Sequence, residues 1–297
     1  MNALLYELIH AGPVLTDGAW GTELQARGLT SVDFPDAWNL THSEQVAAVA
    51  RAYVEAGSRV ILTNTFGANR LRLEPHGLAG QAAEINRRGV ELSRAAAQGR
   101  AAVFASMGPS GKLLLSGETT PDELRAVFEE QARALAVARP DAIVVETMGD
   151  LEEAKAALAA AKTTRLPVVV CMVFDSGKDR DRTMMGATPE QVGQELNTAG
   201  ADVIGANCGV GIEAYVPVCR RLRASTDRPI WIKPNAGLPS VQAGKVVYRT
   251  SPAEFASHLP ALVEAGASFI GGCCGTNPEF IRAARGVLES LRGKGVA

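Results

Sequence analysis

Three stretches of the sequence repeat one pattern: EAGSRVILTN at residues 55–64, TAGADVIGAN at 198–207 and EAGASFIGGC at 264–273. In each stretch a helix-like segment ends at Ala-Gly, and a run of apolar residues follows within a few positions. Glycine at the end of a helix adopts the left-handed conformation that stops the helix. A nearly continuous apolar run is typical of a strand covered on both faces. The pattern therefore predicts helix-to-strand junctions of an α/β protein with a parallel sheet.

The same alternation of strands and helices continues along the whole chain. Strands are expected to begin near Val14, Val60, Ala102, Ala142, Val168, Val203, Ile230 and Phe269. Eight strand–helix units in 297 residues predict a single (β/α)8 TIM barrel, with residues 1–297 as one domain. A doubly wound open sheet shares the alternation and stays open as the alternative. The number of strands, and the lack of a GxGxxG motif after the first strand, favour the barrel.

Capping residues, prolines in first turns and terminal glycines predict several helix boundaries. The expected boundaries are Ser43 or Thr41 with Gly57, Pro121 in the first turn of a second helix, Thr188 and Pro189 with Gly200, and Ser251 and Pro252 with Gly266.

The composition is ordinary for a soluble globular enzyme, with 46% apolar and 21% charged residues. A net charge of -2 gives no basic field, so a nucleic-acid partner is not expected. The sequence has no apolar run of the roughly 20 residues that a membrane span needs, and its first residues lack the charged segment of a secretion signal. Its five cysteines do not form a disulfide framework. A cytoplasmic enzyme is therefore expected.

Polar residues collect where the expected strands end, which is where barrels of this kind build their active sites. These residues are Asp17, Asn64, Ser106, Glu146, Cys208, Asn235, Cys273 and Cys274. Strands six and eight are both even-numbered, and alternate strands supply one layer of inward side chains. Cys208 is therefore expected to meet Cys273 and Cys274 above strand seven, with Asn235 beside them.

The adjacent cysteines of GGCCGT, residues 271–276, suit neither a regular strand nor a relaxed disulfide. They suit a broken strand end at which two thiolates converge. With Cys208, in GANCGVG at 205–211, three thiolates would make a zinc site with one open position. Core packing stays the alternative for these cysteines, because the sequence has no CxxC pair. For Cys171 and Cys219, core packing is the prediction.

Two acids are candidates for recognising an amino-acid head group. Glu146 follows four apolar residues, and an isolated buried carboxylate is costly unless it is paired. A basic side chain or a cationic group of a ligand is therefore expected beside it. Asp17 could bond to its own backbone in a turn. With Gly18 next to it, the N–H groups of that turn could equally bind a carboxylate.

Six motifs in order resemble those of the homocysteine S-methyltransferase family, which are zinc-dependent (β/α)8 enzymes. They are TDGAWGTELQARG (16–28), LTNTFGANR (62–70), VVET (144–147), GANCGVG (205–211), PNAG (234–237) and GGCCGT (271–276). The resemblance implies that Cys208, Cys273 and Cys274 bind Zn²⁺ and form the catalytic centre. It implies that Asp17 and Glu146 hold the amino group of homocysteine, and that Asn235 fills the fourth zinc position without substrate. Gly18, Asn64 and Ser106 complete the expected substrate-binding set.

Within the family, the chain is most similar to the homocysteine module of cobalamin-dependent methionine synthase. The motifs that carry this likeness are LTNTFGANR followed by HGL (76–78), PNAGLP (234–239) and GKVVY (244–248). The betaine-using branch has an aromatic residue after the glutamate, whereas this chain has Thr147, which argues against betaine. Trp20 and Trp38 could cage an onium methyl group, although packing of their loop is the favoured interpretation.

The methyl donor is expected to come from outside the chain, since the cobalamin-dependent enzyme has folate, corrinoid and reactivation modules and this chain ends after its eighth helix. The candidates are a separate methyl-corrinoid protein, free methylcobalamin, or a small sulfonium compound such as S-methylmethionine.

Two other functions compete with methyl transfer to homocysteine. A zinc hydrolase is disfavoured because histidine ligands and an obvious general base are lacking. A catalytically silent zinc barrel could dock a corrinoid protein, for instance through the charged loop at 176–182, although charge-rich loops are usually just solvated. The selenium analogue of homocysteine stays open as an acceptor.

Overall fold

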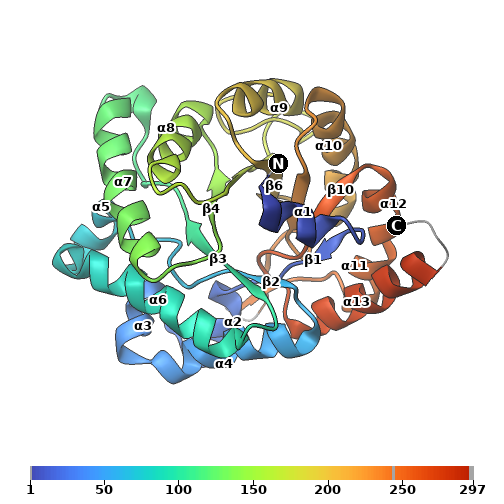
Figure 1. The fold of residues 1–297 in the computed structure, drawn as a ribbon, viewed down its shortest axis with the longest axis horizontal. Helices are drawn as coiled ribbons and strands as arrows, with labels where there is room; N and C mark the ends of the chain where they lie inside the picture. The colour runs from blue at the N-terminus through green and yellow to red at the C-terminus, as the bar shows by residue number, and fades with distance from the viewer. Residues whose placement is uncertain (1, 243–244, 294–297) are drawn as a thin grey trace.

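A computed structural model of the protein describes residues 2–242 and 245–293. In this part of the chain, eight parallel strands form one sheet in the order β1-β10-β7-β6-β5-β4-β3-β2, with helices around it (Figure 1). The strands are β1 (Val14–Leu15), β2 (Val60–Ile61), β3 (Ala102–Met107), β4 (Ala142–Met148), β5 (Val168–Met172), β6 (Val203–Cys208), β7 (Ile230–Pro234) and β10 (Ala267–Ile270).

The two outermost strands in that order, β1 and β2, also meet, and the sheet thereby closes. Arg59 N donates to Leu15 O at 2.8 Å, and Ser58 Oγ donates to Thr16 O at 3.1 Å. An open doubly wound sheet would leave these edges apart. The predicted (β/α)8 barrel is confirmed.

Helices fill the connections between the strands. The longer ones are α4 (Ser43–Ala56), α6 (Ala82–Ala97), α7 (Pro121–Val137), α8 (Leu151–Lys162), α9 (Pro189–Thr198), α10 (Ile212–Ser225) and α13 (Pro278–Gly293). The shorter ones are α1 (Ala3–Ile9), α2 (Gly21–Gln25), α3 (Trp38–Thr41), α5 (Arg70–Leu73), α11 (Pro252–Ser257) and α12 (Leu259–Glu264), with 3-10 turns at Pro35–Ala37, Glu74–His76, Ala79–Gln81 and Leu114–Ser116. No helix in the described ranges is long and apolar enough to cross a membrane.

A small antiparallel hairpin, β8 (Ser240–Gln242) with β9 (Lys245–Val247), follows β7 and was not expected from the sequence. The motif at 244–248 contributes to this hairpin, and its first residue, Gly244, lies outside the described residues.

The three repeated junctions have the predicted geometry. Gly57, Gly200 and Gly266 have φ values of 109°, 88° and 97°, all in the left-handed region that glycine adopts without strain. Each glycine ends a helix and turns the chain into a strand of the barrel.

Three of the predicted helix starts are confirmed by capping boxes. The caps are Thr120, Thr188 and Ser251, each followed by proline in the first turn. The start of α4 differs from the prediction. His42 occupies the cap position and makes no side-chain capping bond, because the short helix α3 runs up to Thr41 and fixes the entry of the chain.

The helix expected between Pro252 and Gly266 is broken in two. α11 ends at Ser257 and α12 begins at Leu259. Pro260 lies at the start of α12, where it has no N–H to continue the hydrogen bonding of α11.

Alternating strand residues divide the apolar core into two layers. Inward residues fill the barrel together with Leu5 and Leu8 of α1, which lies across the barrel in Figure 1. The inward residues are Val14, Val60, Leu62, Phe104, Ala142, Val144, Val169, Cys171, Val203, Trp231 and Phe269. Their outward neighbours pack against the surrounding helices. Cys171 and Cys219 are both buried in this core, as predicted.

The close approach of β6 and β7 generates a stability prediction. A Cβ atom added at Gly205 would lie 2.0 Å from Trp231 O and 2.7 Å from Trp231 Cβ. We expect Gly205→Ala to lower the free energy of unfolding by about 1–3 kcal/mol in urea titrations, because the backbone of β7 must shift. Gly286→Ala is the control, since nothing lies within 4 Å of its added Cβ. It should be stabilising by up to about 1 kcal/mol in the helix. Equal effects of the two substitutions would contradict the prediction.

Candidate metal and substrate site

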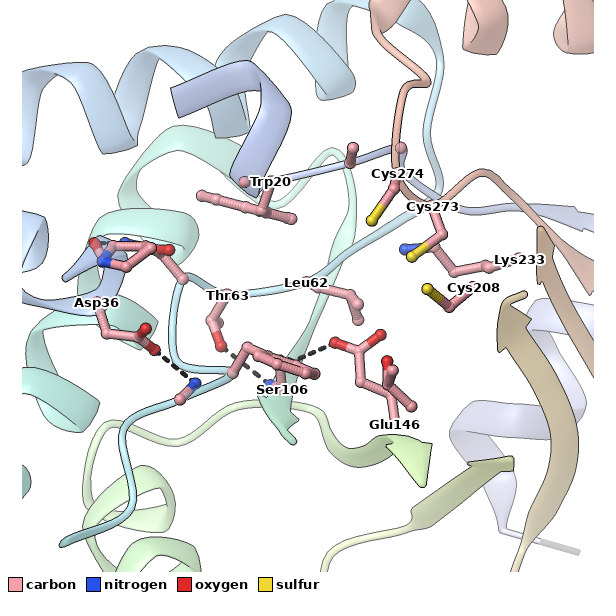
Figure 2. Close-up of a pocket in the computed structure, with 18 of the residues that line it drawn as sticks. Trp20, Asp36, Leu62, Thr63, Ser106, Glu146, Cys208, Lys233, Cys273 and Cys274 are labelled. Carbon is pink, nitrogen blue, oxygen red and sulfur yellow. Dashed lines mark hydrogen bonds between the residues drawn. The ribbon is translucent and has the colours of Figure 1, made fainter. Parts of the chain in front are cut away.

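A cavity of about 280 Å³ opens at the C-terminal ends of the barrel strands. Most of the predicted site residues line it: Gly18, Asn64, Ser106, Glu146, Cys208, Cys273 and Cys274 (Figure 2). Asp17 and Asn235 lie beside the cavity: Asp17 pairs with Lys233 of the cavity wall, and Asn235 N donates to the backbone oxygen of Cys208, which also lines the cavity. The structure therefore brings the residues from the ends of different strands into one place.

The three predicted ligand cysteines meet at one end of the cavity. Their Sγ atoms all lie within 4.8 Å of one another, and none is in a disulfide. Figure 2 shows the three sulfur atoms gathered beside Lys233. Cys208 comes from β6, and Cys273 and Cys274 follow β10, so the two segments flank β7 in the sheet.

The end of β7 fixes the spacing of these two segments. Asn235 N donates to Cys208 O at 3.2 Å, on one side of β7. On the other side, Cys273 N donates to Pro234 O at 2.7 Å and Ala236 N donates to Cys274 O at 2.9 Å. The cysteine segments are therefore held by the backbone, independently of anything bound between them.

A left-handed backbone at Cys208 ends the alternation of β6. Gly205 and Asn207 occupy alternate positions that continue the inward side of Val203, so regular geometry would turn Cys208 toward the helices. Its φ of 65° is rare for a residue with a side chain. This conformation brings Sγ into the cysteine cluster, and such strain is characteristic of functional sites.

The donor set suits a thiophilic metal ion. Tetrahedral zinc with Zn–S bonds of about 2.3 Å separates its sulfur ligands by about 3.8 Å, so small side-chain movements within the cluster would suffice. The neighbouring Cys208 thiol and burial both raise the pKa of Cys273, so a cation is needed to hold all three as thiolates at neutral pH. Asn235 Oδ1 is buried without a hydrogen-bond partner in the described structure, while its Nδ2 donates to Gly209 O at 2.6 Å. A bound metal ion could take this unpartnered oxygen as a ligand.

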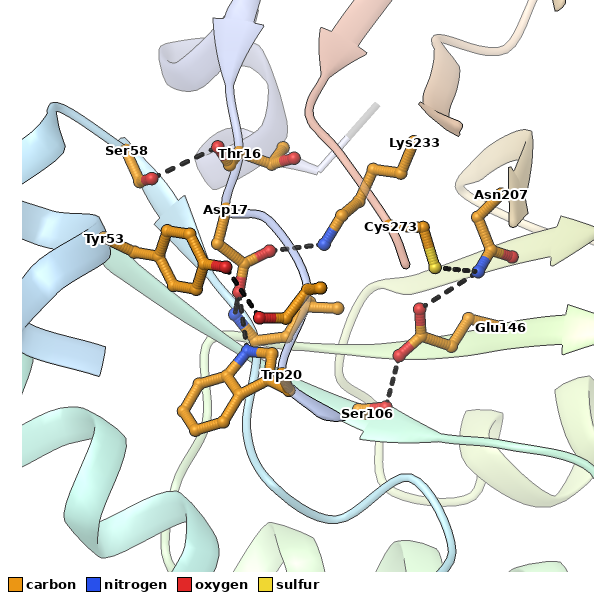
Figure 3. Close-up of polar contacts among 12 residues, drawn as sticks. Thr16, Asp17, Trp20, Tyr53, Ser58, Ser106, Glu146, Asn207, Lys233 and Cys273 are labelled. Carbon is orange, nitrogen blue, oxygen red and sulfur yellow. Dashed lines mark hydrogen bonds and ion pairs between the residues drawn. The ribbon is translucent and has the colours of Figure 1, made fainter. Parts of the chain in front are cut away.

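Asp17 is fully buried, and protein groups occupy both of its carboxylate oxygens (Figure 3). Oδ2 accepts from Trp20 Nε1 at 2.8 Å and from Leu62 N at 2.7 Å. Oδ1 forms an ion pair with Lys233 Nζ. Contact between Asp17 and a substrate amino group stays a prediction, and the structure gives this acid a different cation.

Glu146 lies on the cavity wall and is held from two sides (Figure 3). Ser106 Oγ donates to Oε1, and Asn207 Nδ2 donates to Oε2 at 3.3 Å. Burial raises the pKa of Glu146, although the charge of Lys233 and the Ser106 hydrogen bond oppose that rise. A cationic group bound in the cavity would compensate the buried carboxylate.

Asn64 reaches the cavity, but its amide nitrogen is used by the surrounding loops. Nδ2 donates to Pro35 O at 2.8 Å and to Asn39 Oδ1 at 3.1 Å. Its role in substrate binding stays a prediction, while its role in joining two loops of the cavity wall is visible.

Sequence reasoning missed two residues of the site, Lys233 and Asn207. Lys233 follows the inward Trp231 by two positions, so the period of a strand places it inside the barrel. A lysine in an otherwise apolar strand is a detectable signal. Asn207 donates to Glu146 and also joins the site to Thr147, whose N–H donates to Asn207 Oδ1 at 2.7 Å. It lies within a quoted motif, directly before Cys208.

The cavity has a second polar group at the end away from the cysteines, where Figure 2 shows Asp36. Asp36 Oδ1 accepts from Gly67 N at 2.9 Å. Arg72 also lines the cavity, and its buried Nε has no hydrogen-bond partner in the described residues.

Trp20 lines the cavity too, whereas Trp38 is buried and stacks on His42 with ring centroids 4.3 Å apart. The packing interpretation is confirmed for Trp38.

An eight-stranded parallel barrel with a three-cysteine cluster at the C-terminal ends of its strands defines a (β/α)8 protein with a candidate metal centre. The chain belongs to the homocysteine S-methyltransferase family, whose sequence profile matches residues 14–288. The methionine synthase of Mycobacterium leprae is 31% identical over 94% of this chain and 24% of that protein. The methionine synthase of Mycobacterium tuberculosis is 30% identical over 97% of this chain and 26% of that protein. The chain thus spans about a quarter of the length of these relatives.

A solved structure extends the likeness to three dimensions. The metallated form of the homocysteine methyltransferase MmuM from Escherichia coli has a TM-score of 0.78 and 25% sequence identity. The match covers 96% of this chain and 98% of that chain. The barrel and its family, both expected from the sequence motifs, are confirmed.

The buried carboxyl of Asp36 predicts a pH effect on stability. Burial raises its pKa from 3.8 to about 7, so the folded protein holds this proton more tightly than the unfolded chain. The free energy of unfolding should therefore fall through this group as the pH rises from about 4 to about 7, by at most about 1.4 kcal/mol per pH unit. Asp36→Asn keeps an acceptor for Gly67 N and removes the titration. Its stability relative to wild type, measured by urea unfolding, should rise across this window and level off above it.

Asp33 provides the control for this experiment. It is only partly buried, and hydrogen bonds from Thr30 lower its pKa. The stability of Asp33→Asn relative to wild type should fall as the pH rises through the acidic range, and it should be nearly constant above about pH 5, because the pKa of this group is at or below its ordinary value in both states. A pH-independent difference between Asp36→Asn and wild type would contradict the prediction.

Proposed function

We propose that this protein transfers a methyl group to the sulfur of L-homocysteine to give methionine, using a zinc ion held by Cys208, Cys273 and Cys274. The observation that carries the proposal is the cluster of three sulfur atoms within 4.8 Å at one end of a cavity that Glu146 also lines. Membership of the family and the likeness to a metallated homocysteine methyltransferase support it.

The chemical problem is the protonation state of the acceptor. A free thiol with a pKa near 8.5 is mostly protonated at pH 7, and its deprotonation costs about 2 kcal/mol. Zinc bound to the three cysteines would favour deprotonation of the acceptor thiol, because a coordinated thiol is held as thiolate. Asn235 Oδ1, buried and without a partner, is the group of the chain that would complete the ligand set in the absence of substrate.

The chain itself orients the acceptor. Glu146 is fixed by Ser106 and Asn207, so its carboxylate has a defined place in the cavity. It would bind the α-ammonium group of homocysteine, and this contact offsets the cost of burying the carboxylate. With the sulfur and the ammonium group both fixed, a free lone pair of the sulfur would face the incoming methyl group.

We infer that the methyl group comes from a methyl-corrinoid, on a separate protein or as methylcobalamin. The sulfur–methyl bond would form as the cobalt–methyl bond breaks, and the electron pair of that bond would leave on the corrinoid. Exposed apolar side chains lie on the loops that follow β1, β3, β5 and β7, and we call them the apolar rim: Val32, Leu113, Leu115, Met184, Leu238, Val241 and Val246. Leu115 and Val241 are 82% and 75% exposed. Because parallel strands end at the same face, these loops surround the cavity mouth. An apolar rim around a reaction site suits a partner that covers it during transfer.

The metal ligands can be tested by comparing two cysteines. Cys208→Ala should lose bound zinc and methionine formation together while its circular dichroism stays that of wild type, because the backbone contacts of β7 remain. Cys219→Ala removes a thiol buried between α10 and α12, far from the cluster in the fold, and should keep both. Zinc is measured per chain by mass spectrometry after dialysis. Retention of wild-type zinc in Cys208→Ala would disprove the ligand assignment.

The donor can be tested with a panel of methyl compounds and two sets of surface variants. Methionine should form from methylcobalamin and from a methylcobalamin-loaded corrinoid module of methionine synthase, but not from betaine. Leu115→Asp with Val241→Asp should lower the rate with the loaded module by about tenfold, because the apolar contact is lost. The rate with free methylcobalamin should stay unchanged. Val137→Asp, at the exposed end of α7 on the opposite face, is the control.

Other results would change the conclusion. An equal loss with both donors would contradict docking at the apolar rim. No methionine from any donor, with zinc bound, would favour the catalytically silent barrel.

A second candidate donor is S-methylmethionine, which one observation favours. The far end of the cavity combines Arg72, with an unpartnered buried Nε, and Asp36, while Trp20 lines the space between this end and the cysteines. A carboxylate on Arg72 and an ammonium group on Asp36 would leave a sulfonium beside the indole. Methionine formation from S-methylmethionine, and none from either corrinoid donor, would establish this candidate instead.

A further inference from the structure

Lys233 is a buried cation with hydrogen-bonding capacity left over. Its exposed fraction is 2%, and it lines the cavity. An ammonium group has three N–H donors. Within the described residues, the partner of Nζ is Asp17 Oδ1 alone. A buried cation normally fills its donors, so the remaining ones are available to a ligand in the cavity.

The charges of the site show which ligand group is missing. Asp17 and Glu146 are two buried acids, and Lys233 is the cation near both. Lys233 Nζ forms its ion pair with Asp17, and Glu146 lines the same cavity. Asp17 is already satisfied by Lys233, Trp20 and Leu62. Glu146 can thus take an ammonium group while Lys233 still offers N–H donors.

The turn after Asp17 provides fewer donors for a carboxylate than its sequence indicates. Ala19 N already donates to Thr276 Oγ1 at 3.1 Å. The amide of Leu62 is likewise used by Asp17. Lys233 is therefore the positively charged donor at the cysteine end of the cavity, as Figure 2 shows.

We propose that Lys233 binds the α-carboxylate of the acceptor. The site would then bind a zwitterionic head group, with Glu146 contacting the ammonium group and Lys233 contacting the carboxylate. This inference rests on the proposed function, because it assumes that the acceptor sulfur lies at the cysteine cluster. It assigns Asp17 a different task from the one that the family resemblance implies: Asp17 holds the lysine rather than the substrate. Lys233 is then a residue that determines specificity for amino-acid thiols.

The test compares thiols that lack one charged group each. Zinc-loaded protein is titrated by calorimetry with L-homocysteine, with 3-amino-1-propanethiol, which lacks the carboxylate, and with 4-mercaptobutyrate, which lacks the ammonium group. Lys233→Met removes the cation but leaves Asp17 buried and uncompensated. The double variant Asp17→Asn with Lys233→Met removes both charges of the ion pair and leaves the net charge of the site unchanged, so it is the main comparison.

We expect the double variant to bind homocysteine and 4-mercaptobutyrate about tenfold or more weakly than wild type, and 3-amino-1-propanethiol equally well. Glu146→Gln should show the converse, with the loss confined to the two thiols that have an ammonium group. Arg72→Met, at the other end of the cavity, should affect none of the three.

Two results would overturn the inference and leave the proposed function in place. An equal loss for all three thiols in the double variant would mean that Lys233 only supports the fold of the site. If Arg72→Met weakens the binding of only the two thiols that have a carboxylate, the carboxylate binds at the far end of the cavity instead. If wild-type protein with zinc bound takes up no homocysteine, the proposed function fails and this inference fails with it. Binding by wild type with an equal loss in the variant affects this inference alone.

Discussion

The end of β7 is the constraint on which the rest of the site depends. Asn235 N bonds to the Cys208 segment on one side, and the backbone of 234–236 bonds to the Cys273–Cys274 segment on the other. Parallel strands lie about 4.8 Å apart, so two segments flanking one strand cannot come together by regular pairing alone. The left-handed turn at Cys208 and the break after β10 bring their sulfur atoms within 4.8 Å. The thiol cluster is therefore a consequence of how two strands end beside a third.

The same strand also carries the charge that balances the interior. Inside the barrel an apolar layer that includes Phe104, Trp231 and Phe269 lies below a polar layer that includes Ser106, Glu146 and Lys233. Two positions further along a strand, the next inward side chain belongs to the polar layer instead of the apolar one. Isolated charges at this depth would be costly. Lys233 reduces that cost by lying near Asp17 and Glu146, and the residual negative charge favours a cationic ligand group.

Much of the fold can be predicted from the sequence because its signals are local. The Ala-Gly junctions at Gly57, Gly200 and Gly266 need left-handed glycine, and the apolar strands need cover on both faces. Strand parity predicted that Cys208 would meet the vicinal cysteines, but the left-handed backbone that turns its sulfur into the cluster could not be predicted from parity.

Features that depend on three-dimensional neighbours were harder to foresee. The predicted cap of α4 is wrong because the preceding helix α3 fixes the path of the backbone into α4. The partner of Asp17 could not be deduced, because it depends on which inward side chains of β1 and β7 reach each other across β10. Lys233 is 216 positions from Asp17 in the chain.

Under the proposed function, the acceptor and donor sides of the site would be built from different kinds of structure. Cys208, Glu146 and Lys233 lie on the strands, where packing on all sides fixes their positions. The far end of the cavity and the apolar rim belong to loops, which tolerate change without disturbing the barrel. A family can therefore keep one thiol-binding centre while its loops adapt to different methyl donors. The likeness of this chain both to part of methionine synthases and to a free-standing homocysteine methyltransferase agrees with that division. The strands would define what is methylated, and the loops would define what delivers the methyl group.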